Sequence, residues 1–145
     1  MKIYNKLSKE YYVNLIEDPF DQLDFKNHTI LKESDNYNLN VIGDDLTCTN
    51  INLLKKAFDQ RSIDGIIVKP NQCGTITETI NVINFCKENN IKTILSARSG
   101  DTEENYLSHL AVGWNTDMIK VGSFSRGERM SKWNELLRIK EKLFK

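Results

Sequence analysis

The sequence has little of what marks a secreted, membrane-spanning or nucleic-acid-binding protein. Its three cysteines, Cys48, Cys73 and Cys86, are odd in number and lack metal-ligand spacing, which favours reduced packing thiols over a disulfide framework or a zinc site. Its apolar runs are short, and residues 1–6 lack the apolar segment of a signal peptide, so we expect a cytoplasmic protein without membrane insertion. Lysine plus arginine and aspartate plus glutamate are equal at 20 each, and without a basic stripe we expect no nucleic-acid partner.

What the sequence does contain is a repeated unit. Its 145 residues, 39% of them hydrophobic, suffice for one core, and we expect one domain over residues 1–145. Five apolar segments each end in a polar residue, in steps of 27, 25, 27 and 24 residues. Such steps are typical of repeated βα units and predict an α/β protein. The polar end residues are Glu17, Asp44, Lys69, Ser96 and Lys120.

The predicted strands and helices alternate along the chain. The strands are predicted at 12–17, 39–43, 92–95 and 117–119, with a central strand that follows Asp64 and ends at Lys69. The helices are predicted from Thr49 or Asn50 to about 58, from Thr75 or Thr77 to about 86, from Asp101 or Thr102 to about 112, and over 125–143. Residues 1–10 look like the tail of a helix, and residues 21–38 are polar and expected to be irregular or weakly helical. The last helix is expected to place Met130, Trp133 and Leu137 along one side.

Lys69 is the residue of this pattern that most needs an explanation. It follows the apolar run Ile66–Val68 and precedes Pro70, at the point where a buried strand leaves the core. A lysine ammonium is costly to desolvate, so such a residue is either paired or used in proton chemistry. The alternative is a lysine whose ammonium reaches solvent along its apolar stem. The carboxyl ends of strands are where α/β proteins place their chemistry, which favours the functional interpretation.

Six ordered motifs carry a resemblance to a known family. They are residues 16–20 (IEDPF), 43–47 with 49–50, 68–72 with 74–75, 98–103 (RSGDTE), 119–129 (IKVGSFSRGER) and 132–139 (KWNELLRI). Together they closely resemble the C-terminal part of enolase, over nearly all of the chain after about residue 10. The resemblance implies a partial TIM-type (β/α) barrel made of the last five βα units, without the first barrel strands and the N-terminal capping domain.

The same resemblance implies a lyase of glycolysis, phosphopyruvate hydratase, which interconverts 2-phosphoglycerate and phosphoenolpyruvate. In such an enzyme a base removes a proton from the carbon beside a carboxylate while Mg²⁺ stabilises the enolate. Glu17 and Asp44 match metal ligands, and Lys69 matches the base. The alternative for Glu17 and Asp44 is that they are exposed carboxylates at loop entrances.

The resemblance also implies the residues that bind the substrate. Lys120 matches the catalytic lysine that holds the substrate carboxylate and the enolate, beside Glu17, Asp44 and Ser96 in the binding set. Arg98 and Ser99 match the phosphate site, where a guanidinium can bind two phosphate oxygens. Asp101 and Glu103 are expected to be helix caps.

The sequence departs from the family in three ways. Ala97 stands where family members usually carry histidine, and we expect His28 and His109 to be surface residues that do not replace it. The family's third metal carboxylate, and the glutamates that assist departure of the hydroxyl, belong to segments upstream of the matching region. A complete barrel has eight βα units over about 250 residues, whereas five strands are predicted here.

These departures leave three functions open. The first is a catalytic half of enolase that works when an N-terminal half completes the barrel, so that half, or self-association, supplies the partner. The second is a catalytically silent enolase remnant that acts as a binding or regulatory partner. The third is an enolising enzyme for another acid, which the Arg98–Ser99 motif disfavours.

Overall fold

The computed structural model describes residues 2–34 and 38–144. The chain divides into two compact units, Met1–Lys92 and Thr93–Lys145. The elements of the first unit, in chain order, are α1 (Lys2–Tyr11), β1 (Leu15–Glu17), α2 (Phe25–Lys32), β2 (Asn40–Gly43), α3 (Ile51–Asp59), β3 (Gly65–Val68), α4 (Pro70–Cys73) and α5 (Ile76–Glu88). Strand β4 (Lys92–Ser96) starts at the last residue of that unit, and the second unit continues with α6 (Tyr106–Gly113), β5 (Met118–Lys120) and α7 (Gly127–Leu143).

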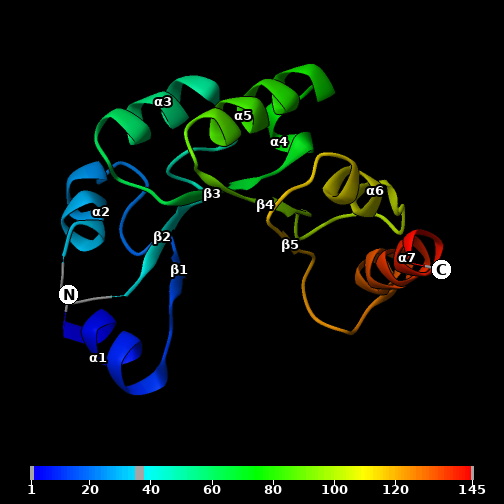
Figure 1. The fold of residues 1–145 in the computed structure, drawn as a ribbon, viewed down its shortest axis with the longest axis horizontal. Coiled ribbons are helices and arrows are strands. Elements are labelled where there is room, and N and C mark those ends of the chain that lie inside the picture. Colours follow the sequence, from blue (N-terminus) through cyan, green and yellow to red (C-terminus); the bar gives the residue numbers. More distant parts are fainter. Residues whose placement is uncertain (1, 35–37, 145) are drawn as a thin grey trace. The chain divides into compact units, whose positions relative to one another are not determined.

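In the first unit, β1, β2 and β3 are neighbouring parallel strands. Leu15 is opposite Asn40 and Glu17 is opposite Ile42, while Ile42 is in turn opposite Gly65. Because the strands run parallel, their carboxyl ends lie at the same edge, as the sequence pattern predicted. All four residues of β3 are buried, and α3 and α5 lie side by side over these strands (Figure 1).

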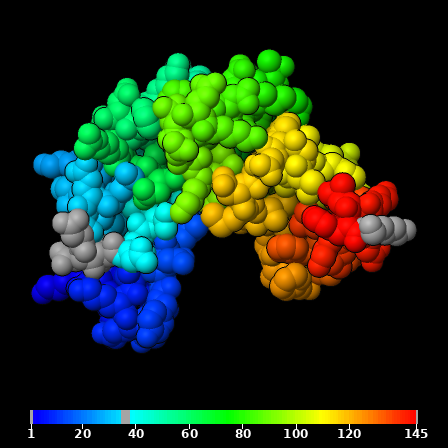
Figure 2. All heavy atoms as spheres, viewed as in Figure 1, coloured from blue at the N-terminus to red at the C-terminus, as the bar shows by residue number. Residues whose placement is uncertain are grey.

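In the second unit, β4 and β5 form a parallel pair in which Ser96 is opposite Lys120. Helices α6 and α7 pack against each other, as the yellow and red elements of Figures 1 and 2 show. The buried side chains of α7 are Lys132 and Glu135. Of the three residues expected along one side of α7, Met130 and Trp133 are partly buried, whereas Leu137 is 60% exposed. The long charged side chains of α7 bury their stems and find polar partners, which apolar periodicity does not anticipate.

Residues 25–32 form the regular helix α2 within the segment that was expected to be irregular or weakly helical; residues 35–37 of that segment lie outside the described residues. The carboxylate of Asp24 accepts a hydrogen bond from the Asn27 amide and caps the helix. Phe25, His28 and Leu31 face the core, so the expectation that His28 is a surface residue was wrong. Its Nδ1 lies 2.7 Å from the Asp24 carbonyl, and its ring packs edge-on against Phe20.

The three cysteines differ in their surroundings. Cys86 on α5 is buried, in line with a packing role, whereas Cys48 and Cys73 are partly exposed. All three are free thiols. Among the described helices, we find none with the length and apolar character needed to cross a bilayer.

Candidate active site

Lys69 and Asp44 form a close ion pair at the carboxyl ends of two neighbouring strands. Asp44 follows β2 directly, and Lys69 follows β3. The Lys69 Nζ donates hydrogen bonds to both carboxylate oxygens of Asp44, 2.7 Å to Oδ1 and 2.6 Å to Oδ2. The two side chains are only 12% and 10% exposed. The ammonium of Lys69 is therefore held by a carboxylate rather than extended into solvent.

Two further residues, which sequence reasoning did not assign to the site, hold this ion pair in place. The carboxylate of Asp18 accepts hydrogen bonds from the backbone N–H of Asp44 at 2.9 Å and of Asp45 at 2.6 Å. Asp18 itself has a left-handed backbone, with φ of 39°, a conformation that aspartate adopts more easily than most residues. The hydroxyl of Thr49 accepts a hydrogen bond from the Lys69 N–H at 2.9 Å.

The signal for Asp18 was present in the sequence as Asp18–Pro19 directly after a strand. That dipeptide indicates a turn, but it does not say which amides the carboxylate binds. Thr49 was one of two expected caps of this helix and part of a family motif, without a role in the site; the cap of α3 is Asn50, the other expected residue, whose side chain accepts from the N–H groups of Asn52 and Leu53.

Glu17 is the second carboxylate at this edge of the first unit. It is the last residue of β1, partly buried, and lies opposite Ile42, two residues before Asp44. Glu17 and Asp44 thus end two adjacent strands, and both offer the hard oxygen donors that Mg²⁺ prefers. No cluster of three or more histidine, cysteine, aspartate or glutamate side chains able to hold a metal ion occurs among the described residues. The donor chemistry fits Mg²⁺, with the remaining positions left to water and to groups beyond these two side chains.

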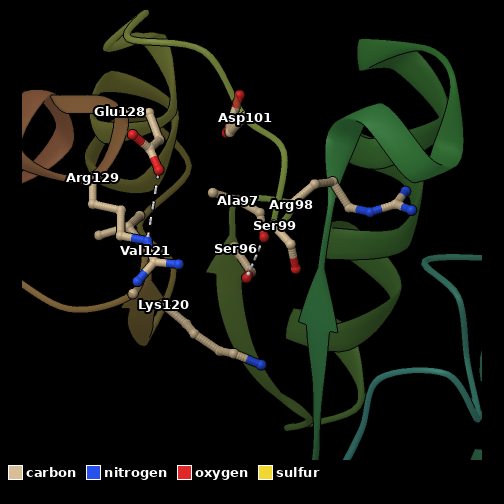
Figure 3. Close-up of a pocket in the computed structure, with 10 residues that line it drawn as sticks. Ser96, Ala97, Arg98, Ser99, Asp101, Lys120, Val121, Glu128 and Arg129 are labelled. Atoms are coloured by element: carbon tan, nitrogen blue, oxygen red, sulfur yellow. Dashed lines mark hydrogen bonds and ion pairs between the residues drawn. The ribbon is translucent and has the colours of Figure 1, made fainter. Parts of the chain in front are cut away.

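The remaining sequence-predicted residues line a cavity in the second unit. This cavity has a volume of about 190 Å³ and lies where β4 and β5 end (Figure 3). Its lining residues are Ser96, Ala97, Arg98, Ser99, Asp101, Lys120, Val121, Gly122, Glu128 and Arg129. All four residues predicted for this part of the site, Ser96, Arg98, Ser99 and Lys120, are therefore brought together.

These four residues play different parts in the cavity. The Ser96 side chain is buried and its hydroxyl donates to the Ala97 carbonyl at 3.0 Å. Lys120 and Arg98 are exposed; Figure 3 shows Lys120 reaching toward the Ser96 side, whereas the Arg98 guanidinium points away from Arg129. The cavity thus has two exposed cationic residues in its lining and a hydrogen-bonded hydroxyl in its wall.

Arg129 is a cationic lining residue that sequence reasoning did not assign. Its guanidinium lies beside Glu128, with 4.0 Å between Nε and Oε1, and donates to the Ser123 hydroxyl at 3.2 Å. Gly122 has φ of 87°, and a Cβ there would come within 2.8 Å of the Arg129 side chain. Only glycine at position 122 therefore allows both this turn and this position of the arginine.

A buried lysine holds the segment that follows Ser99. Lys132 on α7 is 1% exposed; its Nζ lies 3.7 Å from the Asp101 carboxylate and donates a hydrogen bond to the Thr102 carbonyl. Because these contacts keep residues 101 and 102 in an irregular conformation, α6 starts only at Tyr106, after Asn105. The expectation that Asp101 or Thr102 caps this helix was therefore wrong.

Two groups in these surroundings have shifted pKa values. The hydrogen bond from Arg138, supported by Asn105 and by the nearby His109, lowers the pKa of Glu135 on α7. Burial, together with the neighbouring aspartates 45, 44 and 18, raises the pKa of the Cys48 thiol in the first unit. The hydrogen bonds to Glu135 favour its charged carboxylate, whereas burial and the nearby carboxylates favour the neutral thiol of Cys48.

Comparisons with known proteins bear on both parts of the site. The family model "Enolase, C-terminal TIM barrel domain" matches residues 1–145. Similar curated proteins include "Enolase" of Metallosphaera sedula, 46% identical over 139 residues, which are 96% of this chain and 33% of that protein. "Enolase" of Pelagibacter ubique is 45% identical over 145 residues (100% and 34%), and "Enolase" of Sulfurisphaera tokodaii is 48% identical over 136 residues (94% and 32%). The chain thus spans about a third of the length of the relatives that it matches.

Proposed function

This chain belongs to the family of the enolase C-terminal TIM barrel domain, and we propose that it provides the proton-abstracting part of a 2-phosphoglycerate dehydrating site. The observation that carries the proposal is the contact between the Lys69 ammonium and both oxygens of Asp44. This contact places an amine at the carboxyl edge of parallel strands, where it could take a proton from a carbon acid once Asp44 no longer holds it in its charged form. Lys69 would be that base.

The two carboxylates would hold the metal ion of the reaction. Glu17 and Asp44 end adjacent strands and would bind Mg²⁺, which supplies stabilisation of the negative charge that develops on the substrate carboxylate. In the described arrangement the Asp44 oxygens are bonded to the Lys69 ammonium. Ligation by Asp44 would therefore release Lys69 from a strong ionic partner and leave its nitrogen available for the substrate.

The cavity of the second unit would bind the phosphate and the carboxylate of the substrate. Arg98 and Ser99 would take the phosphate, because a guanidinium offers paired donors that match phosphate oxygens. Lys120 would neutralise the substrate carboxylate and the enolate. Ser96, whose hydroxyl is bonded to the Ala97 carbonyl, would line the substrate pocket.

Turnover would also require groups from outside these residues. The chain covers about a third of the length of its relatives. A third metal ligand and the acid for the leaving hydroxyl would come from the remaining part, in a longer chain or in a separate one.

A second candidate function is a catalytically silent remnant that binds other proteins. Ala97 favours it, because the methyl group offers the substrate neither a hydrogen bond nor a proton.

The test is a complementation assay. The chain is mixed with the N-terminal part of a related enolase, complex formation is measured by analytical ultracentrifugation, and phosphoenolpyruvate is followed by its absorbance. We expect turnover that Lys69→Ala abolishes and that Lys140→Ala, an exposed lysine of α7, leaves unchanged. A stable complex without turnover contradicts catalysis and favours the silent remnant.

Two measurements separate the parts of the proposal. Calorimetric titration with Mg²⁺, in the presence and absence of 2-phosphoglycerate, should give heat that Glu17→Gln and Asp44→Asn each reduce. Ala97→His should raise turnover in the complemented enzyme if the missing imidazole limits the reaction. Unchanged Mg²⁺ binding in both carboxylate variants would refute the assigned metal ligands.

A further inference from the structure

Two cysteines line the same cavity in the first unit. Cys48, in the turn after β2, and Cys73, at the end of α4, both line a cavity of about 140 Å³ in the first unit. Both are partly exposed, whereas the third cysteine, Cys86, is fully buried. A reagent that enters this cavity from solvent therefore comes close to two cysteines on two different segments.

Each of these thiols is fixed by its backbone to one member of the ion pair. The N–H of Cys48 donates to the carbonyl of Asp44 at 2.8 Å, and the N–H of Cys73 donates to the carbonyl of Lys69 at 3.3 Å. Each cysteine thus lies one turn after the residue to which it is bonded. Because the two side chains of the ion pair touch, the two turns are held close together.

The residues that adjoin the thiols also touch. Thr49, which follows Cys48, donates from its hydroxyl to Gln72 Oε1 at 3.4 Å, and Gln72 precedes Cys73. The same hydroxyl accepts the N–H of Lys69. The two bridges lie before and after Cys48 and both before Cys73, so they hold the two segments together and give the cysteines a high effective concentration for each other.

We propose that Cys48 and Cys73 form a reversible disulfide when the protein meets a hydroperoxide. In the first step the Cys73 thiol loses its proton and its sulfur attacks one oxygen of hydrogen peroxide; the O–O bond breaks, a sulfenic acid forms, and the departing hydroxide takes up that proton as water. In the second step the Cys48 sulfur attacks the Cys73 sulfur, the S–O bond breaks, and the hydroxyl leaves as water with the Cys48 proton. Two thiols lose two electrons and two protons, and hydrogen peroxide is reduced to two waters.

The order of these steps follows from the hydrogen bonds of the thiols. The Cys48 Sγ donates to the Asp45 carbonyl at 3.1 Å, a bond that engages this sulfur within its own turn, so we place the first oxidation at Cys73. The disulfide would tie the turn that carries Asp44 to the turn that carries Lys69. The inference depends on the placement of the thiols and not on the proposed function, since it predicts chemistry in the chain alone.

The experiment is a peptide map of the full chain after exposure to hydrogen peroxide. Remaining thiols are alkylated, the protein is digested without reduction, and linked peptides are identified by mass spectrometry. Under native conditions we expect the Cys48–Cys73 link to predominate, Cys86 to stay unmodified, and dithiothreitol to restore three thiols. In guanidinium chloride all three pairings should appear.

Two variants sharpen the result. Cys48→Ser removes the resolving sulfur, so about tenfold more sulfinic acid should accumulate at Cys73 than in the wild-type chain. Cys86→Ser should leave the yield of the link unchanged. A native map that matches the denatured one, links only between separate chains, or a Cys73 that oxidises equally in the presence and absence of Cys48 would each overturn the proposal.

Discussion

The ion pair of Lys69 and Asp44 should contribute measurably to the stability of the first unit. We consider Lys69→Met, which keeps the stem and removes the charge, and Asp44→Asn. Exposed ion pairs contribute about 0–1 kcal/mol, whereas removing one partner of a fully buried pair costs about 3–5 kcal/mol. With side chains 12% and 10% exposed and both carboxylate oxygens bonded, this pair lies nearer the buried limit. We therefore expect Lys69→Met to lower the free energy of unfolding by about 2–3 kcal/mol.

Urea unfolding followed by circular dichroism provides the measurement, because both tryptophans, Trp114 and Trp133, lie in the second unit and do not report on the first. The double variant should be destabilised by less than the sum of the single variants, with a coupling of about 1.5–2 kcal/mol. Lys6→Met is the matched control, since the Lys6–Glu10 pair spans 3.9 Å with both side chains about 60% exposed. If Lys69→Met costs no more than Lys6→Met, or if the single effects add, the ion pair does not stabilise the fold.

Three further predictions concern stability elsewhere in the chain. The neighbours of Glu135 lower its pKa in the folded protein below the ordinary value of 4.5. The charged carboxylate therefore stabilises the folded form above pH 4.5, and this stabilisation is lost as the pH falls through the pKa of the folded state. Glu135→Gln should therefore reduce the loss of stability between about pH 7 and about pH 3.5, measured by tryptophan fluorescence in urea; an unchanged loss would contradict this. Gly65→Ala places a Cβ 2.7–2.9 Å from atoms of the neighbouring strands, so it should lower the free energy of unfolding, measured by circular dichroism, by about 1–3 kcal/mol. At Gly113 an added Cβ meets no atom within 4 Å, so Gly113→Ala should be neutral or stabilising. Equal midpoints for the two glycine variants would refute the close approach. Lys132→Ala should destabilise the fold more than Lys132→Met does, by about 1 kcal/mol or more, because only methionine refills the buried space of the lysine stem. The measurement is urea unfolding followed by tryptophan fluorescence, and a more stable Lys132→Ala variant would show that packing of the stem does not contribute.

The strands could be predicted because one pattern, an apolar segment that ends in a polar residue, occurs five times along the sequence. Within each unit the strands deliver their polar residues to one edge, and the parallel register of β1 with β2 and of β4 with β5 agrees with this. The resemblance to enolase and the partial (β/α) barrel are confirmed by the family match over residues 1–145. Bound Mg²⁺, the partner half, self-association and the absence of nucleic acid stay predictions.

Features that depend on packing between elements were predicted poorly. His28 was assigned to the surface from its polar segment, yet it is buried on α2 together with Phe25 and Leu31, and its ring packs against Phe20. The late start of α6 depends on Lys132, 30 residues after Thr102. Asp101 and Thr102 could each cap a helix, but their contacts with the buried ammonium of Lys132 place them in a loop ahead of α6.

The turn at Asp18 has a consequence for how this region tolerates substitution. Glycine would keep the left-handed turn and lose the anchor for the amides of Asp44 and Asp45, whereas glutamate would keep the charge in a residue poorly suited to the turn. Asparagine would tolerate the turn but has one acceptor oxygen, so it could replace only one of the two carboxylate oxygens that bind these amides. A random library screened for folded protein should therefore recover very few residue types at position 18, although the Asp18 side chain is not part of the ion pair. The restriction comes from the structural role of Asp18, and an unchanging aspartate here would not by itself indicate a catalytic residue.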